Sequence, residues 1–149
     1  MYSSFSGKDE LFFALVADQL DKRLAVVADG AVGQRDLRQL FDDAEDDLAA
    51  LSTTERDWHL LFIECWVRAV RDPERRAEWA RQRRAARAVI ADFFERHAAA
   101  AGEPLSAPAA DLALAAMALS NGLAMEYIAD PESADPGLFA RTLARMVMA

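Results

Sequence analysis

Two histidines and one cysteine are the side chains of this chain best suited to nucleophilic or metal chemistry. His59 and Cys65 lie six residues apart in one predicted helix, which places them on different faces, and His97 belongs to another helix. A catalytic nucleophile needs an adjacent base, and a metal centre needs several ligands at a recognisable spacing. Since neither pattern occurs, the sequence predicts no catalytic residue, no metal site and no cofactor, and we expect a protein that is not an enzyme.

Two runs of charge are candidates for binding a cation or a nucleic acid. The acidic run consists of Asp42, Asp43, Glu45, Asp46 and Asp47. It lies on the polar arc of a predicted helix, without a loop that would converge its oxygens on one ion. The arginine-rich run consists of Arg75, Arg76, Arg81, Arg83, Arg84 and Arg87. These arginines spread around several sides of a helix without interleaved stacking aromatics. We interpret both runs as solvated faces.

Composition favours one soluble, cytoplasmic domain with little affinity for nucleic acid. The chain has 149 residues, enough for a single domain with its own hydrophobic core. Its 25 acidic and 17 basic residues give a net charge of −8, which opposes binding to phosphates. One cysteine excludes an internal disulfide and fits a reducing compartment. We see no leader pattern and no uninterrupted apolar run of membrane length, and we expect no membrane association.

Hydrophobic spacing is helical almost throughout, which predicts an all-α fold of six helices without a sheet. We place these helices at about residues 8–28, 35–51, 54–72, 74–100, 109–129 and 136–148. Ser6 is the expected N-cap of the first helix, with Asp9 three residues later in an arrangement like a capping box. Pro73 ends the third helix and begins the fourth, because its ring lacks an N–H group but suits a first turn.

Several of these helices carry apolar side chains on more than one face. The first has a second apolar surface formed by Leu11, Phe12 and Leu15, which we expect to pack against a partner outside this sequence. The third is apolar around most of its circumference and therefore belongs in the interior. The fifth is apolar on two sides and is expected to lie between two layers.

Two polar side chains, Arg83 and His97, lie on the apolar stripe of the fourth helix. We interpret His97 as a helix-end residue beside the last carbonyl groups rather than as a ligand. For Arg83 two interpretations stay open. A buried guanidinium needs a carboxylate or an anionic ligand, whereas its long stem also allows the charge to reach water.

The opening segment resembles the junction between the two parts of TetR/AcrR-family transcriptional regulators. Tyr2 and Phe5 form the Tyr-x-x-Phe pair that closes a helix-turn-helix in that family. Gly7 and Lys8 match the turn that starts its long connecting helix. The helices that read DNA are absent from this sequence, so we expect a truncation ahead of the segment.

Two later segments extend this resemblance over the rest of the chain. Residues 61–74 look like the central helix and Asp-Pro break of the family's effector domain. Residues 119–123 resemble its late Asp-Gly-Leu segment, although Asn121 stands where Asp is frequent and so argues against a charge-based ligand role there.

The resemblance implies the end of a helix-turn-helix at residues 1–7 and a six-helix effector-binding and dimerisation domain at residues 8–149. The last two helices would form a four-helix bundle with those of a second copy. Tyr2 and Lys8 match positions that touch DNA phosphates, which position a protein without reading sequence. We expect DNA binding only where the missing N-terminal helices are present, because a helix must enter the major groove.

The resemblance also implies a small-molecule pocket in the core and an interface on the last two helices. The expected pocket residues are Trp58, Phe62, Trp66, Trp79, Arg83, Phe93, Met117, Asn121 and Met125. The expected dimer residues are Leu112, Ala116, Leu119, Leu123, Phe139, Leu143 and Met146. Plain core packing is the alternative explanation for each pocket residue, and which face of the fifth helix meets the partner stays open.

By this resemblance the chain is a homodimeric, one-component transcriptional repressor whose DNA binding is controlled by a small hydrophobic or aromatic effector. Two alternatives stay open. One is a headless effector domain that forms heterodimers with an intact regulator and inactivates it. The other is a ligand-binding helical protein without a role at DNA. Mixed dimers with an intact regulator would distinguish the first alternative.

Overall fold

A computed structural model describes residues 3–30, 53–135 and 137–148 of the chain. Its elements are α1 (Ser3–Gly30), α3 (Thr53–Arg71), α4 (Pro73–Ala101), α5 (Ala109–Ala129), the short 3₁₀ helix η1 (Pro131–Ser133) and α6 (Leu138–Val147). These described residues contain no strand, and the predicted all-α class is confirmed. The helix expected at residues 35–51, its acidic run and Tyr2 lie outside the described residues.

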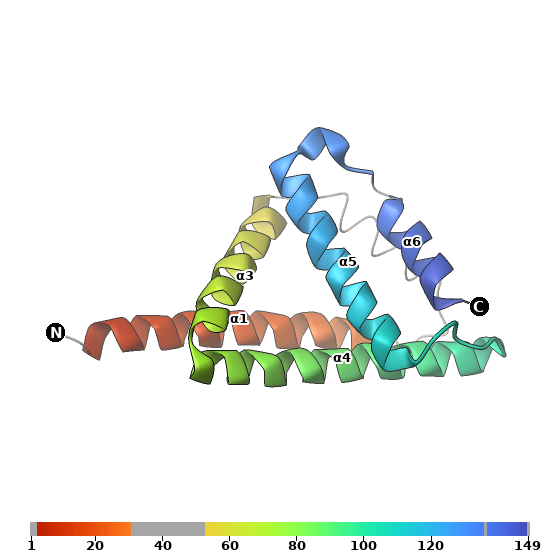
Figure 1. The fold of residues 1–149 in the computed structure, drawn as a ribbon, viewed down its shortest axis with the longest axis horizontal. Helices are drawn as coiled ribbons and strands as arrows, with labels where there is room; N and C mark the ends of the chain where they lie inside the picture. The colour runs from red at the N-terminus through yellow and green to blue at the C-terminus, as the bar shows by residue number, and fades with distance from the viewer. Residues whose placement is uncertain (1–2, 31–52, 136, 149) are drawn as a thin grey trace.

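The helices form a triangle that stands on a pair of long helices (Figure 1). α1 and α4 lie side by side along the base, and α3 and α5 rise from α4 as the two sides. α6 packs beside α5, on the side away from α3. α4 therefore contacts α1, α3 and α5 and sets the positions of all three.

Both ends of α4 are capped. The Asp72 carboxylate accepts hydrogen bonds from the backbone N–H groups of Glu74 (2.9 Å) and Arg75 (3.3 Å), with Pro73 in the first turn. At the other end Gly102 adopts a left-handed conformation (φ 70°), and its N–H group bonds back to carbonyl oxygens of the last turn. The predicted break between the third and fourth helices is confirmed.

Asp72→Ala should destabilise the protein, because it removes the acceptor for two N–H groups at the start of α4. Loss of an N-cap side chain costs about 1 kcal/mol, which a urea melt followed by circular dichroism will measure. Asp72→Asn is the matched control, since it keeps a capping oxygen but removes the negative charge. That charge forms an ion pair with Arg75, whose Nε atom lies 3.7 Å from Asp72 Oδ2. Equal losses in the two variants would assign the effect to the charge and not to the cap.

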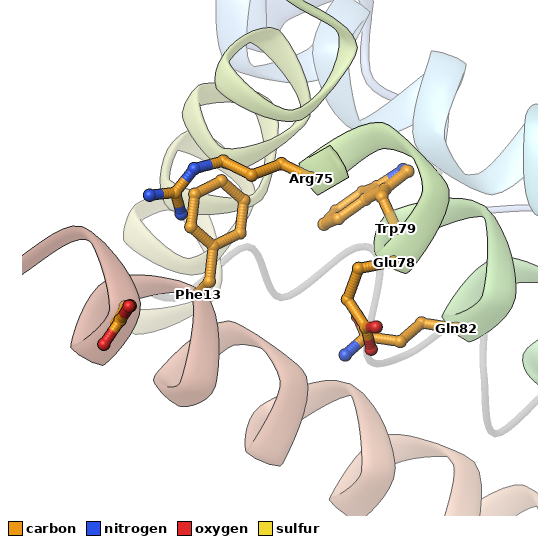
Figure 2. A pocket seen from close by; sticks show the side chains of 6 residues that line it. Phe13, Arg75, Glu78, Trp79 and Gln82 are labelled. Atoms are coloured by element: carbon orange, nitrogen blue, oxygen red, sulfur yellow. The ribbon is translucent and has the colours of Figure 1, made fainter. Parts of the chain in front are cut away.

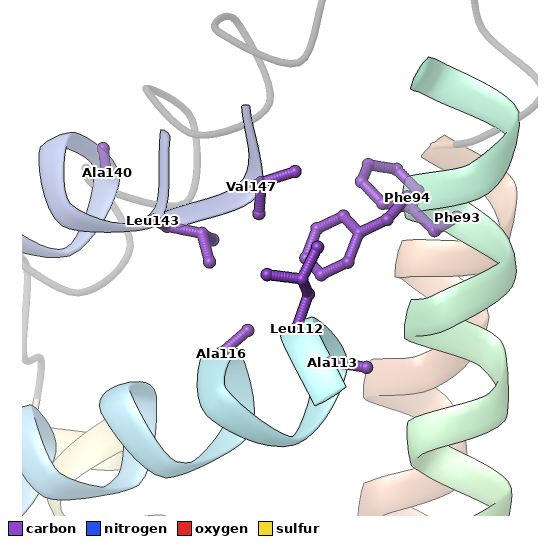
Figure 3. Close-up of a cluster of buried hydrophobic side chains, with 8 residues drawn as sticks. All are labelled: Phe93, Phe94, Leu112, Ala113, Ala116, Ala140, Leu143 and Val147. Carbon is purple, nitrogen blue, oxygen red and sulfur yellow. The ribbon is translucent and has the colours of Figure 1, made fainter. Parts of the chain in front are cut away.

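Buried side chains form two clusters, one near each end of α4. The N-terminal cluster joins α4 to α1 and α3 and consists of Val16, Phe62, Cys65, Ala69 and Trp79. The C-terminal cluster joins α4 to α5 and α6 and consists of Phe93, Phe94, Leu112, Ala113, Ala116, Ala140, Leu143 and Val147 (Figure 3). The two clusters explain why α3 and α5 meet α4 at separate places.

Two expectations for α1 and α3 are wrong. α1 begins at Ser3, so Ser6 lies inside the helix and is not its N-cap. α3 is not buried on nearly all sides, because Leu60 and Trp66 are 45% and 48% exposed. An apolar side chain does not by itself specify a buried position, since much of a folded protein's accessible surface is apolar.

The second apolar surface of α1 is divided between solvent and core. Leu11 and Leu15 are 71% and 50% exposed, so the described residues do not cover them. Phe12 instead packs against the N-terminal cluster, with its ring centroid 5.1 Å from the guanidinium carbon of Arg68. Phe12 is thus half-buried against its own chain, and an external partner for this surface stays a prediction.

α5 exposes apolar surface on the side opposite to the C-terminal cluster. Leu114 and Met125 are 46% and 51% exposed, and the exposed Ala118 lies between them on the same helix face. By length and composition alone α5 could cross a membrane, although a core helix of a soluble protein passes the same test. The high apolar content of α5 is explained by its two apolar faces, one of which is buried in the C-terminal cluster.

Candidate functional site

Three aromatic side chains from α3 and α4 meet in and beside the N-terminal cluster. The Phe62 ring centroid lies 6.2 Å from that of Trp58 and 5.2 Å from that of Trp79. Phe62 and Trp79 are buried, and Trp58 is half-buried with the Arg23 guanidinium carbon 4.7 Å from its ring centroid. We refer to Trp58, Phe62 and Trp79 as the aromatic cluster. Surfaces of this kind bind apolar and planar groups.

Arg83 follows Trp79 by one turn of α4 and reaches the aromatic cluster. Its guanidinium carbon lies 5.4 Å from the centroid of the Phe62 ring. Burial lowers the pKa of Arg83, and the neighbouring Arg87 cation lowers it further. An arginine nevertheless keeps its charge at neutral pH. The site therefore holds a poorly solvated cation against an aromatic ring.

Arg87 lies one turn further along the same face of α4 and is half-buried as well. Its Nε atom is shielded from solvent and has no hydrogen-bond partner. Cations at positions i and i+4 repel each other, and a buried donor without an acceptor is costly. Within the described residues no carboxylate pairs with Arg83 or Arg87, although the chain contains 25 acidic residues.

The remaining half-buried arginine of α4 differs in having carboxylate partners. Arg75 lies 3.8 Å from Asp9 of α1 and 3.7 Å from Asp72. Arg68 of α3 also contacts Asp9 (2.9 Å) and pairs with Glu64 (2.6 Å), as the i,i+4 spacing predicts. We refer to this set of contacts, where α1 meets the α3–α4 turn, as the helix junction.

A small pocket opens between α1 and α4 next to the helix junction (Figure 2). Its walls are Glu10, Phe13, Arg75, Glu78, Trp79 and Gln82. Figure 2 shows the Arg75 guanidinium against the Phe13 ring, whose centroid lies 4.5 Å from the guanidinium carbon. The volume of about 170 Å³ is smaller than the roughly 300 Å³ at which small-molecule sites begin. This pocket suits a small group and not a whole effector.

Cys65 and His97, which were considered for catalysis, lie in environments that do not activate them for it. Cys65 is fully buried, and burial raises the pKa of its thiol to about 11, so little reactive thiolate forms near neutral pH. His97 Nδ1 lies 2.9 Å from the carbonyl oxygen of Phe93, one turn earlier in α4. His97 therefore contacts a carbonyl group within α4 and not one of the last carbonyl groups that the prediction named. The described part of the chain has no group of three potential metal ligands.

Residues 37–149 match the family model described as the BetI-type transcriptional repressor, C-terminal. The chain belongs to this family. The match confirms the resemblance to TetR-type regulators that the sequence motifs indicated. No curated protein and no solved structure matches the chain.

Some of the pocket residues predicted for this BetI-type domain lie together and others do not. Those that lie together are Trp58, Phe62, Trp79 and Arg83. Phe93 belongs to the C-terminal cluster, Met117 is buried on α5, and Asn121 is half-buried. Trp66 and Met125 are 48% and 51% exposed, so neither points into the described core. Large apolar residue types indicated these positions but not the direction of their side chains.

The residues predicted for the dimer interface differ in how far this chain buries them. Leu112, Ala116 and Leu143 are 5%, 6% and 3% exposed and belong to the cluster that contains Phe93 and Phe94 (Figure 3). They leave no surface for a second copy. The other predicted residues are half-buried: Leu119, Leu123, Phe139 and Met146. α5 has two apolar faces, and α4 and α6 cover the face that carries Leu112 and Ala116.

Arg87 is the site residue that the sequence interpretation missed. The arginine-rich run was expected to be a solvated face, and Arg76, Arg81 and Arg84 are exposed. Arg87 is not, and the available signal was its i+4 spacing from Arg83 on the apolar stripe of the helix.

Proposed function

We propose that this chain is the effector-binding and dimerisation part of a homodimeric, ligand-controlled transcriptional repressor. The observation that carries the proposal is its BetI-type family match over residues 37–149. The architecture supports it, because a ligand bound beside α4 would contact the helix that positions α1, α3 and α5. A shift of α4 would then reach α1, which lies along it.

The proposed effector site is the aromatic cluster together with Arg83. Phe62 and Trp79 lie buried between two helices, and Trp58 is partly accessible at the edge of the cluster. Small-molecule sites typically combine apolar and aromatic walls with a few polar groups that fix orientation. A hydrophobic or aromatic compound is the class of ligand that such walls favour.

The proposed dimer interface is the exposed apolar face of α5. Leu114, Ala118 and Met125 lie on this face, and a Cβ atom added at Gly122 would meet no neighbouring atom within 4 Å. Small residues allow a second helix to approach closely. A symmetric dimer would cover this face with the same face of a second copy, which is the simplest closed arrangement.

DNA reading is assigned in this proposal to helices that join α1 at its N-terminal end. α1 runs through residues 7 and 8 without a break. In this proposal a continuous helix therefore connects the end of the helix-turn-helix, at residues 1–7, with the effector domain at residues 8–149. Leu11 and Leu15 are exposed near this end and offer apolar surface for the head. Lys8 is exposed there and is the proposed phosphate contact, together with Tyr2.

Tryptophan fluorescence and melting temperature test the effector site. Trp66→Phe serves as the reporter protein, because Trp66 is exposed and its removal leaves Trp58 and Trp79, both in the aromatic cluster. A panel of hydrophobic and aromatic compounds should include members that change the emission saturably. At a ligand concentration of about 100 times Kd the stability should rise by about 2.7 kcal/mol. A flat emission response with an unchanged melting temperature across the panel would count against the proposed function.

A further inference from the structure

Arg83 and Arg87 form a strip of positive charge on the face of α4 that meets the aromatic cluster. We propose that the effector is an amphipathic anion, whose carboxylate or phosphate group binds Arg83 and Arg87 while its apolar part packs against the aromatic cluster. This inference rests on the proposed function and adds the chemical class of the effector to it.

The first argument is the missing counter-charge. Arg87 has a buried Nε atom without an acceptor, and the Arg83 guanidinium lies against the Phe62 ring without a carboxylate partner among the described residues. Arg75 shows that the same helix satisfies a half-buried guanidinium with carboxylates where the fold needs it. A cation that is partly removed from water is stabilised by a counter-charge, so two half-buried guanidinium groups without one mark a place for an anion.

The second argument is the geometry of the two guanidinium groups. Residues at i and i+4 are neighbours on a helix surface, about 5–6 Å apart at their Cβ atoms. Each guanidinium offers a fork of N–H donors that matches the oxygens of a carboxylate or phosphate. One oxyanion between Arg83 and Arg87 would accept from both, supply the missing acceptor of Arg87 Nε and relieve their mutual repulsion.

The third argument is the neighbouring apolar surface. Trp79 precedes Arg83 by one turn of α4, and Phe62 faces the Arg83 guanidinium from α3. The apolar part of a ligand whose anionic group is bound by the arginines would therefore contact the aromatic cluster. An inorganic anion would use only the charge, whereas the aromatic cluster, with the half-buried Trp58 at its edge, favours a molecule that also has an apolar part.

The test compares octyl compounds that differ in the head group: octanoate, octyl phosphate, octanol and octyltrimethylammonium. Isothermal titration calorimetry with the full chain should give octanoate or octyl phosphate a Kd at least about tenfold lower than octanol, since charge-assisted hydrogen bonds favour the anion. The ammonium compound should bind most weakly. The better of the two anions identifies the head group as carboxylate or phosphate.

Arg83→Gln and Arg87→Gln should each remove most of the preference for the anion while octanol binding persists. Arg84→Gln is the matched control, because Arg84 is an exposed arginine of the same helix and should leave every Kd unchanged. If octanol and octyltrimethylammonium bind as tightly as octanoate and octyl phosphate, the inferred effector class is wrong although the proposed effector site remains. If no octyl compound binds while other hydrophobic compounds do, the inference also fails; if no compound of either panel binds, the proposed function fails with it.

A second variant separates a bound anion from a carboxylate of this chain. Arg87→Met keeps an apolar stem but removes the unpaired donor, so the melting temperature of the ligand-free protein should rise by roughly 2–5 °C. A lower melting temperature would show that Arg87 already has a structural partner in the free protein and would overturn the inference. This measurement needs no ligand and does not depend on the titrations.

Discussion

Replacing Leu114 and Met125 together by glutamate is expected to convert the proposed homodimer into a monomer. Both side chains are about half exposed on the face of α5 that the proposed dimer would bury. In a two-fold interface the new carboxylates of both copies meet in apolar surroundings, where desolvation and like-charge repulsion act together. We expect a loss of about 3 kcal/mol or more, roughly a hundredfold or more in the dimer Kd.

Analytical ultracentrifugation or light scattering over a range of protein concentrations measures this effect. Leu60→Glu is the matched control, because Leu60 is 45% exposed on α3 and Leu114 is 46% exposed on α5. The control should remain a dimer, and circular dichroism should show that all variants stay folded. A dimer that survives both substitutions, or one that Leu60→Glu alone dissociates, would place the interface elsewhere.

Phe94→Ala is expected to be the most destabilising single substitution in the C-terminal cluster. The Phe94 side chain is 2% exposed and packs edge-on against Phe93, with ring centroids 5.8 Å apart. Figure 3 shows its ring in the space that α4 shares with Leu112 of α5 and Val147 of α6. Truncation to alanine removes this packing and leaves a cavity. We expect a loss of about 3–5 kcal/mol in the free energy of unfolding, which is typical of a buried aromatic side chain.

Urea melts at one fixed protein concentration measure this loss, since the apparent stability of a dimer depends on concentration. Phe94→Leu is the conservative control and should cost clearly less, because it fills much of the same volume. A loss below about 1 kcal/mol for Phe94→Ala would mean that the cluster collapses around the gap without cost, contrary to a tightly packed core.

Helix boundaries were predictable because a few residues end a helix through their own covalent structure. Pro73 cannot continue the preceding helix, and Gly102 takes up a left-handed conformation that side chains with a Cβ atom disfavour. The predicted ends of α3, α4 and α5 accordingly lie within one residue of the structure. The start of α1 was missed because serine is typical of an N-cap, whereas Ser3, Ser4 and Ser6 all lie inside this helix.

The burial of each helix face was less predictable, because periodicity identifies an apolar face without naming its neighbour. Leu112 and Leu114 are both apolar residues on α5, yet one is 5% exposed and the other 46%. That difference depends on where α4 and α6 lie, which is a tertiary contact and not a local property. The same limit explains Arg87, whose environment is decided by neighbouring helices and not by the run of arginines around it.

The helix junction ties three helix segments to one another at the N-terminal half of α1. Arg68 and Arg75 come from opposite sides of the α3–α4 turn, and both reach the Asp9 carboxylate. Their guanidinium groups also lie over the neighbouring Phe12 and Phe13 rings. Exposed pairs of this kind add little stability, typically below about 1 kcal/mol each. Their effect would be on orientation: these contacts fix the direction of α1 relative to the α3–α4 turn, so we expect a tilt of α4 to change the direction of α1 as well.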